Sequence, residues 1–247
     1  MDKNELIAKV KKLINLHKKG LLGGEIMPED SNPNLTKASK ENFIYFTLPM
    51  ALNYQRNSYT LWQSALKTWK DKETIKVFDT INISKLSFEK VQEYLTKYKL
   101  ALQKNKQTEI WIKLCLSINK HFDGDIRNLF INNNNDIIEV KNYILKNKKD
   151  FPYLSGTKIL NYWLYVISQY TNINLKNKHS ISVAPDTHII QSSLKLGVIS
   201  PQDLDKSNIR EIVSLRWEKL LKDTNIYPID IHTPFWLWSR NKFKVEI

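Results

Sequence analysis

The sequence predicts an all-α protein, and three observations support this. Apolar residues recur at helical spacing along most of the 247-residue chain, glycine is scarce at six residues, and no strand–turn–strand pattern with a glycine turn occurs. Hydrophobic residues make up 42% of the chain, enough for the core of one large or two small domains. The β-branched segment 110–118 fits this fold class least well.

The first part of the chain alternates helical segments with short breaks. Leu6, Val10 and Leu13 mark an amphipathic N-terminal helix, and glycines and prolines then predict a long loop through about Thr36. Asp125 stands where it can cap a helix. Further apolar faces predict helices within 46–52, 61–69, 91–102, 110–118 and 137–145.

The last part of the chain repeats this pattern. Ser200–Asp203 has the serine, proline and acid expected where a helix begins. The segment 209–221 presents one apolar face, and Thr233–Pro234 is expected to begin the last helix. The whole chain therefore predicts helices joined by short loops.

The chain carries 38 lysines and arginines against 25 aspartates and glutamates, a formal net charge of +13. A surplus of this size favours a polyanionic partner, with nucleic acid as the first candidate. The alternative is compositional bias, because a chain rich in asparagine and lysine can be basic without such a partner. Charge alone therefore favours nucleic acid only modestly.

Cys115 is the only cysteine, so the chain can form no internal disulfide and no cysteine-ligated zinc or iron–sulfur site. We expect no metal and no other cofactor. No apolar stretch approaches the roughly 20 residues that span a membrane, and the first residues lack the apolar core of a signal peptide. The expected location is intracellular, in the cytoplasm or nucleoid, without membrane association.

The segment Phe151–Lys158 has the composition of a turn between two helices, and an apolar helix follows it over 159–167. Free N–H groups at Gly156, Thr157 and Lys158 would bind a phosphate at the start of the second helix without reading sequence. An ordinary helix–helix turn is the alternative. The segment predicts DNA binding only when it is combined with other motifs.

Asp186, within Val183–Ile190, stands where the N-cap of a helix belongs. Pro185 favours an extended Ala184, and the helix is expected to continue through about Leu196. A carboxylate at a helix N-terminus is favoured in its anionic form. One interpretation is plain capping. The other is a fixed negative charge that stabilises the oxocarbenium-like sugar formed when an N-glycosidic bond breaks.

Together, Pro152–Lys158 and Val183–Ile189 resemble the paired signature of the helix-hairpin-helix superfamily of endonuclease III and 8-oxoguanine DNA glycosylases. That signature is a hairpin of the type Leu-Pro-Gly-Val-Gly-x-Lys, an apolar helix and then Val-Asp-Thr-His. Leu52–Ser58 resembles the family's early Leu-Ser-x-Gln segment, and Ile229–Arg240 resembles its late helix. The last third is most similar to archaeal 8-oxoguanine glycosylases. The resemblance covers roughly residues 43–240.

The resemblance implies a base-excision-repair glycosylase with lyase activity, a monomer acting on double-stranded DNA that contains a damaged base. It would remove an oxidised purine such as 8-oxoguanine by flipping the base. Asp186 would stabilise the oxocarbenium ion, and Lys158 would form a Schiff base with the sugar C1′, after which β-elimination cuts the strand. Lys149 is the reserve candidate, because the catalytic lysine of the archaeal relatives lies earlier on a longer helix.

The resemblance also assigns residues that bind the base and the DNA. Trp62 and Trp236 match positions that line the flipped-base pocket, and core packing is the alternative for each. His232 stands where the archaeal pattern has an aspartate that contacts the base, which leaves the identity of the base open. The DNA-binding residues would be Gln55, filling the space of the flipped nucleotide, and the hairpin residues Ser155, Gly156 and Thr157.

Several features depart from the family pattern. The hairpin keeps one glycine, Gly156, and Leu154 takes the place of the other. Pro185 replaces the residue before the aspartate, and residues 171–180 form a polar insertion. The cysteines of the family's iron–sulfur cluster are absent, which excludes that cofactor.

Two other functions stay open: a monofunctional alkyl-base glycosylase that does not use Lys158, and a non-catalytic DNA-binding helix-hairpin-helix protein. Asp186 separates the last from the enzymes, because a pure DNA binder has no need of an anion that repels phosphates. In this superfamily a central helical domain is inserted into a second domain. We therefore expect domains of 40–170, with the helix-hairpin-helix at about 140–168, and of 1–39 plus 171–247, with the site in the cleft between them.

Overall fold

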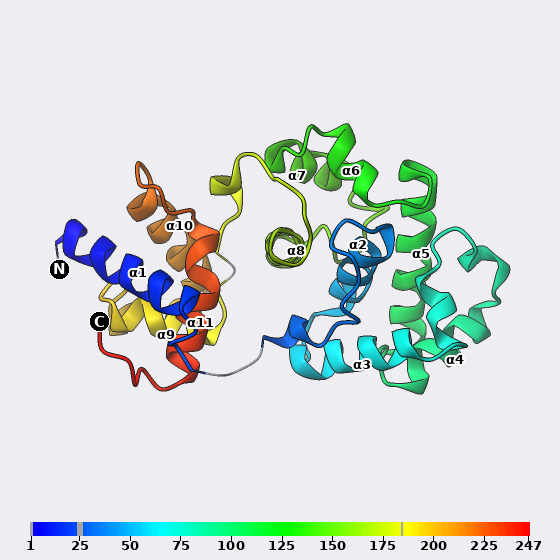
Figure 1. Ribbon diagram of the computed structural model, residues 1–247, viewed down its shortest axis with the longest axis horizontal. Helices are drawn as coiled ribbons and strands as arrows, with labels where there is room; N and C mark the ends of the chain where they lie inside the picture. Colours follow the sequence, from blue (N-terminus) through cyan, green and yellow to red (C-terminus); the bar gives the residue numbers. More distant parts are fainter. Residues whose placement is uncertain (1, 24–26, 184) are drawn as a thin grey trace. The chain divides into compact units, whose positions relative to one another are not determined.

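The computed structural model describes residues 2–23, 27–183 and 185–247, and these form helices without any strand (Figure 1). The predicted all-α class is therefore confirmed. The described residues contain one isolated parallel β-bridge, between Asp136 and Lys176. The predicted conformation of Ala184 lies outside the described residues. In the same ranges, no helix combines the length and the apolarity that crossing a bilayer requires.

The chain divides into two compact units. One, called here the terminal unit, comprises Met1–Glu25 with Lys178–Ile247, and the other, the central unit, comprises Ile26–Asn177. The sequence predicts a central domain of 40–170, which leaves 26–39 and 171–177 outside it. The structure places both segments in the central unit.

The central unit carries the helices between the two chain ends. Its α-helices are α2 (Lys40–Thr47), α3 (Ser58–Lys70), α4 (Phe88–Lys97), α5 (Lys104–Phe122), α6 (Arg127–Asn132), α7 (Ile137–Lys146) and α8 (Thr157–Tyr170). Short 3₁₀ turns join them: η1 (Pro28–Asp30), η2 (Pro49–Leu52), η3 (Thr74–Phe78) and η4 (Ile83–Lys85). The β-branched run 110–118 lies inside α5, because its buried side chains share one helical face.

Tryptophans on α5 and α8 anchor the core of the central unit. Each buries its ring and gives its indole N–H to an acceptor inside the core. Trp163 donates to the hydroxyl of Thr47 at 3.1 Å, and Trp111 donates to the carbonyl of Val77 at 2.8 Å. Cys115 is buried beside Trp111 on α5, and burial raises the pKa of its thiol. Cys115 is therefore a packing residue.

Side-chain contacts explain why 26–39 and 171–177 belong to the central unit. The hydroxyl of Tyr45 donates to the carbonyl of Ser31 at 2.8 Å, which ties the early loop to α2. At the other end, the side chain of Asn177 donates to Asp136 at 2.7 Å, beside the bridge to Lys176. A glycine- and proline-rich composition predicts the loop but not the surface on which it lies.

The terminal unit combines the first helix with the last third of the chain. Its helices are α1 (Lys3–Lys18), α9 (Thr187–Lys195), α10 (Ile209–Leu221) and α11 (His232–Arg240), with the 3₁₀ turns η5 (Lys178–Ser180), η6 (Pro201–Asp203) and η7 (Pro228–Ile231). α11 packs against both α9 and α1, and Figure 1 shows the blue α1 beside the red α11.

Buried hydroxyls join the helices of the terminal unit. The indole of Trp217 donates to the Ser193 hydroxyl at 2.8 Å, and Ser192 donates to the carbonyl of Phe235 at 2.9 Å. Two predicted helix starts differ from the structure. Ser200–Asp203 forms a capping box on a single 3₁₀ turn, not on a longer helix, and α11 begins one residue before Thr233, at His232.

Candidate functional site

Asp186 is the N-cap residue of α9 in the terminal unit. Its Oδ1 accepts the backbone N–H groups of His188 at 2.9 Å and Ile189 at 3.0 Å. Both bonds end on the same oxygen, so the second carboxylate oxygen has no hydrogen bond to any described residue. The helix therefore fixes the carboxylate and leaves Oδ2 available as an acceptor.

A chain of polar side chains lies beside Asp186, across α9 and α11. The Ser239 hydroxyl donates to the side-chain oxygen of Gln191 at 2.7 Å and lies 3.1 Å from Nδ1 of His188. Because the hydroxyl has one proton and gives it to Gln191, it accepts from Nδ1–H of His188. This hydrogen bond favours the tautomer of His188 that carries its proton on Nδ1.

Trp236 and His232 lie on α11, and both side chains are almost completely buried, at 7% and 4% exposure. The Trp236 ring meets the His188 ring edge to face, with centroids 5.4 Å apart. The guanidinium of Arg240 lies over the indole, 5.1 Å from its centroid. To stack on that face of Trp236, a flipped base would have to take the place of Arg240.

Trp62, the other predicted base-pocket residue, lies on α3 in the core of the central unit. It is fully buried and packs against Tyr45 and Phe46, with centroids 5.7 and 5.6 Å from its own. Its indole nitrogen has no hydrogen-bond partner among the described residues. Trp62 thus belongs to one unit, while Trp236 and His232 belong to the other, so a pocket shared by all three stays a prediction.

The predicted hairpin lies between α7 and α8. Tyr153 adopts a left-handed conformation with φ 59°, which turns the chain toward α8. Gly156 is the N-cap of α8, and no side chain caps this helix. The expectation of a free N–H at Gly156 was wrong, because this group donates to the carbonyl of Tyr153 at 3.0 Å. The N–H of Thr157 has no acceptor in the described chain.

The hairpin surface is open to solvent. Gly156, Thr157 and Lys158 are exposed, and Ser155 is half-buried with its hydroxyl 3.5 Å from the carbonyl of Lys148. A Cβ at Gly156 would lie 3.2 Å from the carbonyl of Tyr153, so a larger residue would crowd this turn. Lys149, the reserve lysine, is also exposed, in the connection before α8.

Two tyrosines bring the predicted Gln55 segment to the hairpin. The rings of Tyr54 and Tyr153 stack with centroids 4.3 Å apart and planes 15° from parallel. The ammonium of Lys106, on α5, lies over both rings, at 5.6 and 5.3 Å. Hydrogen bonding to Lys106 lowers the pKa of the Tyr153 hydroxyl. Gln55 follows Tyr54 directly, is exposed, and has φ 50°.

Tyr54, Tyr153 and Lys106 are not among the site residues predicted from the sequence. Each stood beside or near a motif, but nothing in a single sequence shows that positions so distant along the chain stack together. Their contacts place Gln55 and the hairpin, which the resemblance assigns to DNA binding, on neighbouring parts of the central unit.

Glu29, on η1, is a buried acid that the sequence analysis also missed. Its side chain is 1% exposed, and its Oε1 accepts the hydroxyl proton of Tyr162, on α8, at 2.7 Å. Burial raises the pKa of Glu29 to about 7, while Tyr162 and the nearby indole of Trp62 act in the opposite direction. The early loop therefore places a titratable group between α3 and α8.

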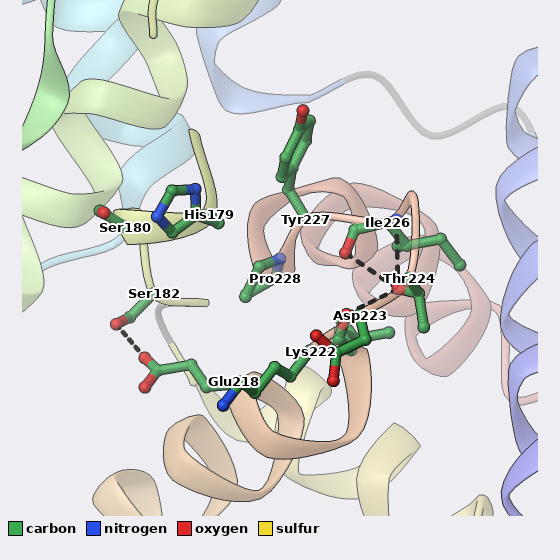
Figure 2. Close-up of a pocket in the computed structure, with 11 residues that line it drawn as sticks. His179, Ser180, Ser182, Glu218, Lys222, Asp223, Thr224, Ile226, Tyr227 and Pro228 are labelled. Atoms are coloured by element: carbon green, nitrogen blue, oxygen red, sulfur yellow. Dashed lines mark hydrogen bonds between the residues drawn. The ribbon is translucent and has the colours of Figure 1, made fainter. Parts of the chain in front are cut away.

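A cavity of about 580 Å³ opens in the terminal unit, between η5, the end of α10 and η7 (Figure 2). Ser182 donates a hydrogen bond to Glu218 on its wall. The lining carries Lys222 against the two acids Glu218 and Asp223, so it does not favour an anion. None of the residues predicted to form the site lines this cavity.

In comparisons with known proteins, no family model matches the sequence, and no curated protein matches it significantly. Among the described residues, no three histidines, cysteines or acids gather as metal ligands would. The candidate site is therefore Asp186 with its α9–α11 neighbours in the terminal unit, and the hairpin with Gln55 in the central unit.

Proposed function

We propose that the protein is a DNA glycosylase with lyase activity that removes an oxidised purine from double-stranded DNA. The observation that carries the proposal is the Asp186 carboxylate: two amides of α9 hold one of its oxygens, and no described residue hydrogen-bonds to the other. A fixed anion of this kind stabilises positive charge that develops on a sugar. The net charge of +13 supports a polyanionic substrate.

The mechanism assigns separate tasks to the two residues. When the base leaves, the C1′–N bond breaks and the base takes its electron pair, while Asp186 stabilises the oxocarbenium character of the sugar. The Lys158 amine then supplies an electron pair to C1′, loses a proton and, after the sugar ring opens, forms a Schiff base. Loss of a C2′ proton and of the 3′ phosphate breaks the strand.

The test is a panel of duplexes carrying different lesions, with borohydride added to reduce and trap any Schiff base. The 8-oxoguanine duplex is expected to give base release and a covalent complex. Lys158→Gln should abolish trapping, whereas Lys149→Gln should retain it. If the two variants behave in the opposite way, the Schiff-base lysine is Lys149. Base release without any trapping would establish a monofunctional enzyme.

Asp186→Asn tests the central role of the carboxylate. The amide keeps the oxygen that caps α9 but removes the charge, so base release should fall by at least about 100-fold while duplex binding persists. Asp136→Asn is the control, because Asp136 also caps a helix, α7, where its carboxylate accepts the Ile138 N–H at 2.8 Å. An Asp186→Asn variant with wild-type activity would contradict the glycosylase mechanism. If the wild-type protein binds duplex DNA but releases no base from any lesion, it is a DNA-binding protein only.

A further inference from the structure

A basic hollow lies beside α3 in the central unit. It has a volume of about 520 Å³, and one of its walls is a face of α3. Thr60, Gln63, Ser64 and Lys67 lie on that wall at the spacing of successive helical turns. This stretch of α3 is polar where a helix packed on a core would be apolar.

The opposite wall is the end of α4 and the chain that follows it. Lys97 and Lys99 lie there, and Arg56 approaches from the loop before α3. None of the described residues that line the hollow is an aspartate or a glutamate. Lys97 is paired with Asp71 at 2.6 Å, but Lys67 and Lys99 form no ion pair within the described ranges.

Arg56 contributes a donor that has no acceptor. Two of its guanidinium nitrogens donate to the carbonyls of Leu100 at 2.7 Å and Lys99 at 3.2 Å. Its Nε–H is buried and unbonded among the described residues. A buried donor without an acceptor is costly, and an anionic oxygen in the hollow would satisfy it.

We propose that this hollow binds a backbone phosphate of a nucleic-acid strand. Among the described residues, the charges of Lys67 and Lys99, which form no ion pair, and the unsatisfied Nε–H of Arg56 match the charge and the acceptor oxygens of a phosphate. Arg56 follows Gln55, which the resemblance to the helix-hairpin-helix superfamily places in the duplex, so a strand bound at Gln55 passes close to the hollow. The proposal thus rests on the proposed function only for the source of the phosphate.

The experiment measures affinity for an undamaged duplex by fluorescence anisotropy at about 50 to 200 mM salt. The variants are Lys67→Gln, Lys99→Asn and the double variant. Asparagine suits position 99 because Lys99 has φ 58°. Because the hollow binds one phosphate, the double variant should reduce the slope of log affinity against log salt by about 0.9, and each single variant should reduce it by part of this amount. Lys85→Gln, at an exposed position outside the hollow, is the charge-matched control.

A slope that is unchanged in the double variant, or equally reduced by Lys85→Gln, would overturn the proposal. Titration with inorganic phosphate, followed by the NMR signal of the Arg56 Nε–H, separates the two sources of phosphate. If inorganic phosphate shifts this signal in the wild type, but the double variant binds the duplex with the wild-type salt slope, the hollow binds free phosphate. That result would overturn the assignment to a strand. The undamaged duplex keeps the result independent of base excision, so the reduced slope would still support the hollow if no glycosylase activity were found.

Discussion

Replacing Glu29 with glutamine should remove a pH dependence from the stability of the folded chain. The folded protein holds the pKa of Glu29 at about 7, against an ordinary value of 4.5. Burial is the main cause, the charge of Asp30 adds to it, and the hydroxyl of Tyr162 opposes it. Glutamine has the shape of the protonated acid and keeps an acceptor for Tyr162, but it does not titrate.

The sign follows from which state holds the proton. Between pH 4.5 and 7 the folded chain retains a proton on Glu29 that the unfolded chain releases. The free energy of unfolding therefore falls as pH rises through this window, and the loss is complete above pH 7. At about 1.4 kcal/mol per pKa unit, the loss is about 3 kcal/mol.

Urea unfolding of the full chain, followed by tryptophan fluorescence across this window, measures the effect. Glu29→Gln should flatten the decline by about 3 kcal/mol. Glu139→Gln, which changes an exposed acid on α7, should leave it unaltered. Tyr162→Phe removes the hydrogen bond that lowers the pKa, so the decline should extend to higher pH. A Glu29→Gln variant with the wild-type decline would refute the reasoning.

Three further predictions concern local structure. Gly124→Ala should destabilise the chain by more than about 1 kcal/mol in a thermal melt, because Gly124 has φ 75° and an added Cβ would lie 2.5 Å from Ile81. Gly20→Ala is the control and should destabilise the chain less, because Gly20 has φ 68° but no atom of the described residues lies within 4 Å of an added Cβ. A double-mutant cycle of Tyr54→Ala and Tyr153→Ala should give a coupling energy of about 1 kcal/mol, and a value near zero would show that the stack adds nothing. Asp186→Asn should change the free energy of unfolding by no more than about 1 kcal/mol, because the capping oxygen remains; a larger loss would mean that the charge itself stabilises α9.

Local features of the sequence predict the elements well. The helical spacing of apolar residues locates α5 even though the run 110–118 is rich in β-branched residues, because burial on one face outweighs their weak helix propensity. Asp186 is recognisable as an N-cap because capping depends on neighbours within three residues. Helical spacing and capping depend on residues that are close together in the chain, so the sequence alone is enough to predict them.

Contacts between distant segments are where prediction from the sequence ends. The loop that carries Glu29 looks polar and irregular, yet tertiary packing buries this acid against α8. The sequence does not predict the stack of Tyr54 on Tyr153 either, since a tyrosine is equally compatible with a surface and with a core. At the hairpin, the prediction of an open N–H at Gly156 was wrong because a turn conformation at Tyr153 supplies an acceptor.

These long-range contacts bear on the proposed chemistry through α8. Lys158 lies in the first turn of α8, and Tyr162 lies one turn later on the same side of the helix. Because Tyr162 donates to Glu29, the early loop fixes the helix from which the candidate nucleophile projects. Ionisation of Glu29 near pH 7 strengthens that hydrogen bond while charging a buried site, so the two effects on α8 oppose each other. If the loop positions Lys158, Glu29→Gln should alter the rate of Schiff-base trapping without changing the affinity for undamaged duplex. Glu29 would then be a positioning residue for a lysine that it does not touch.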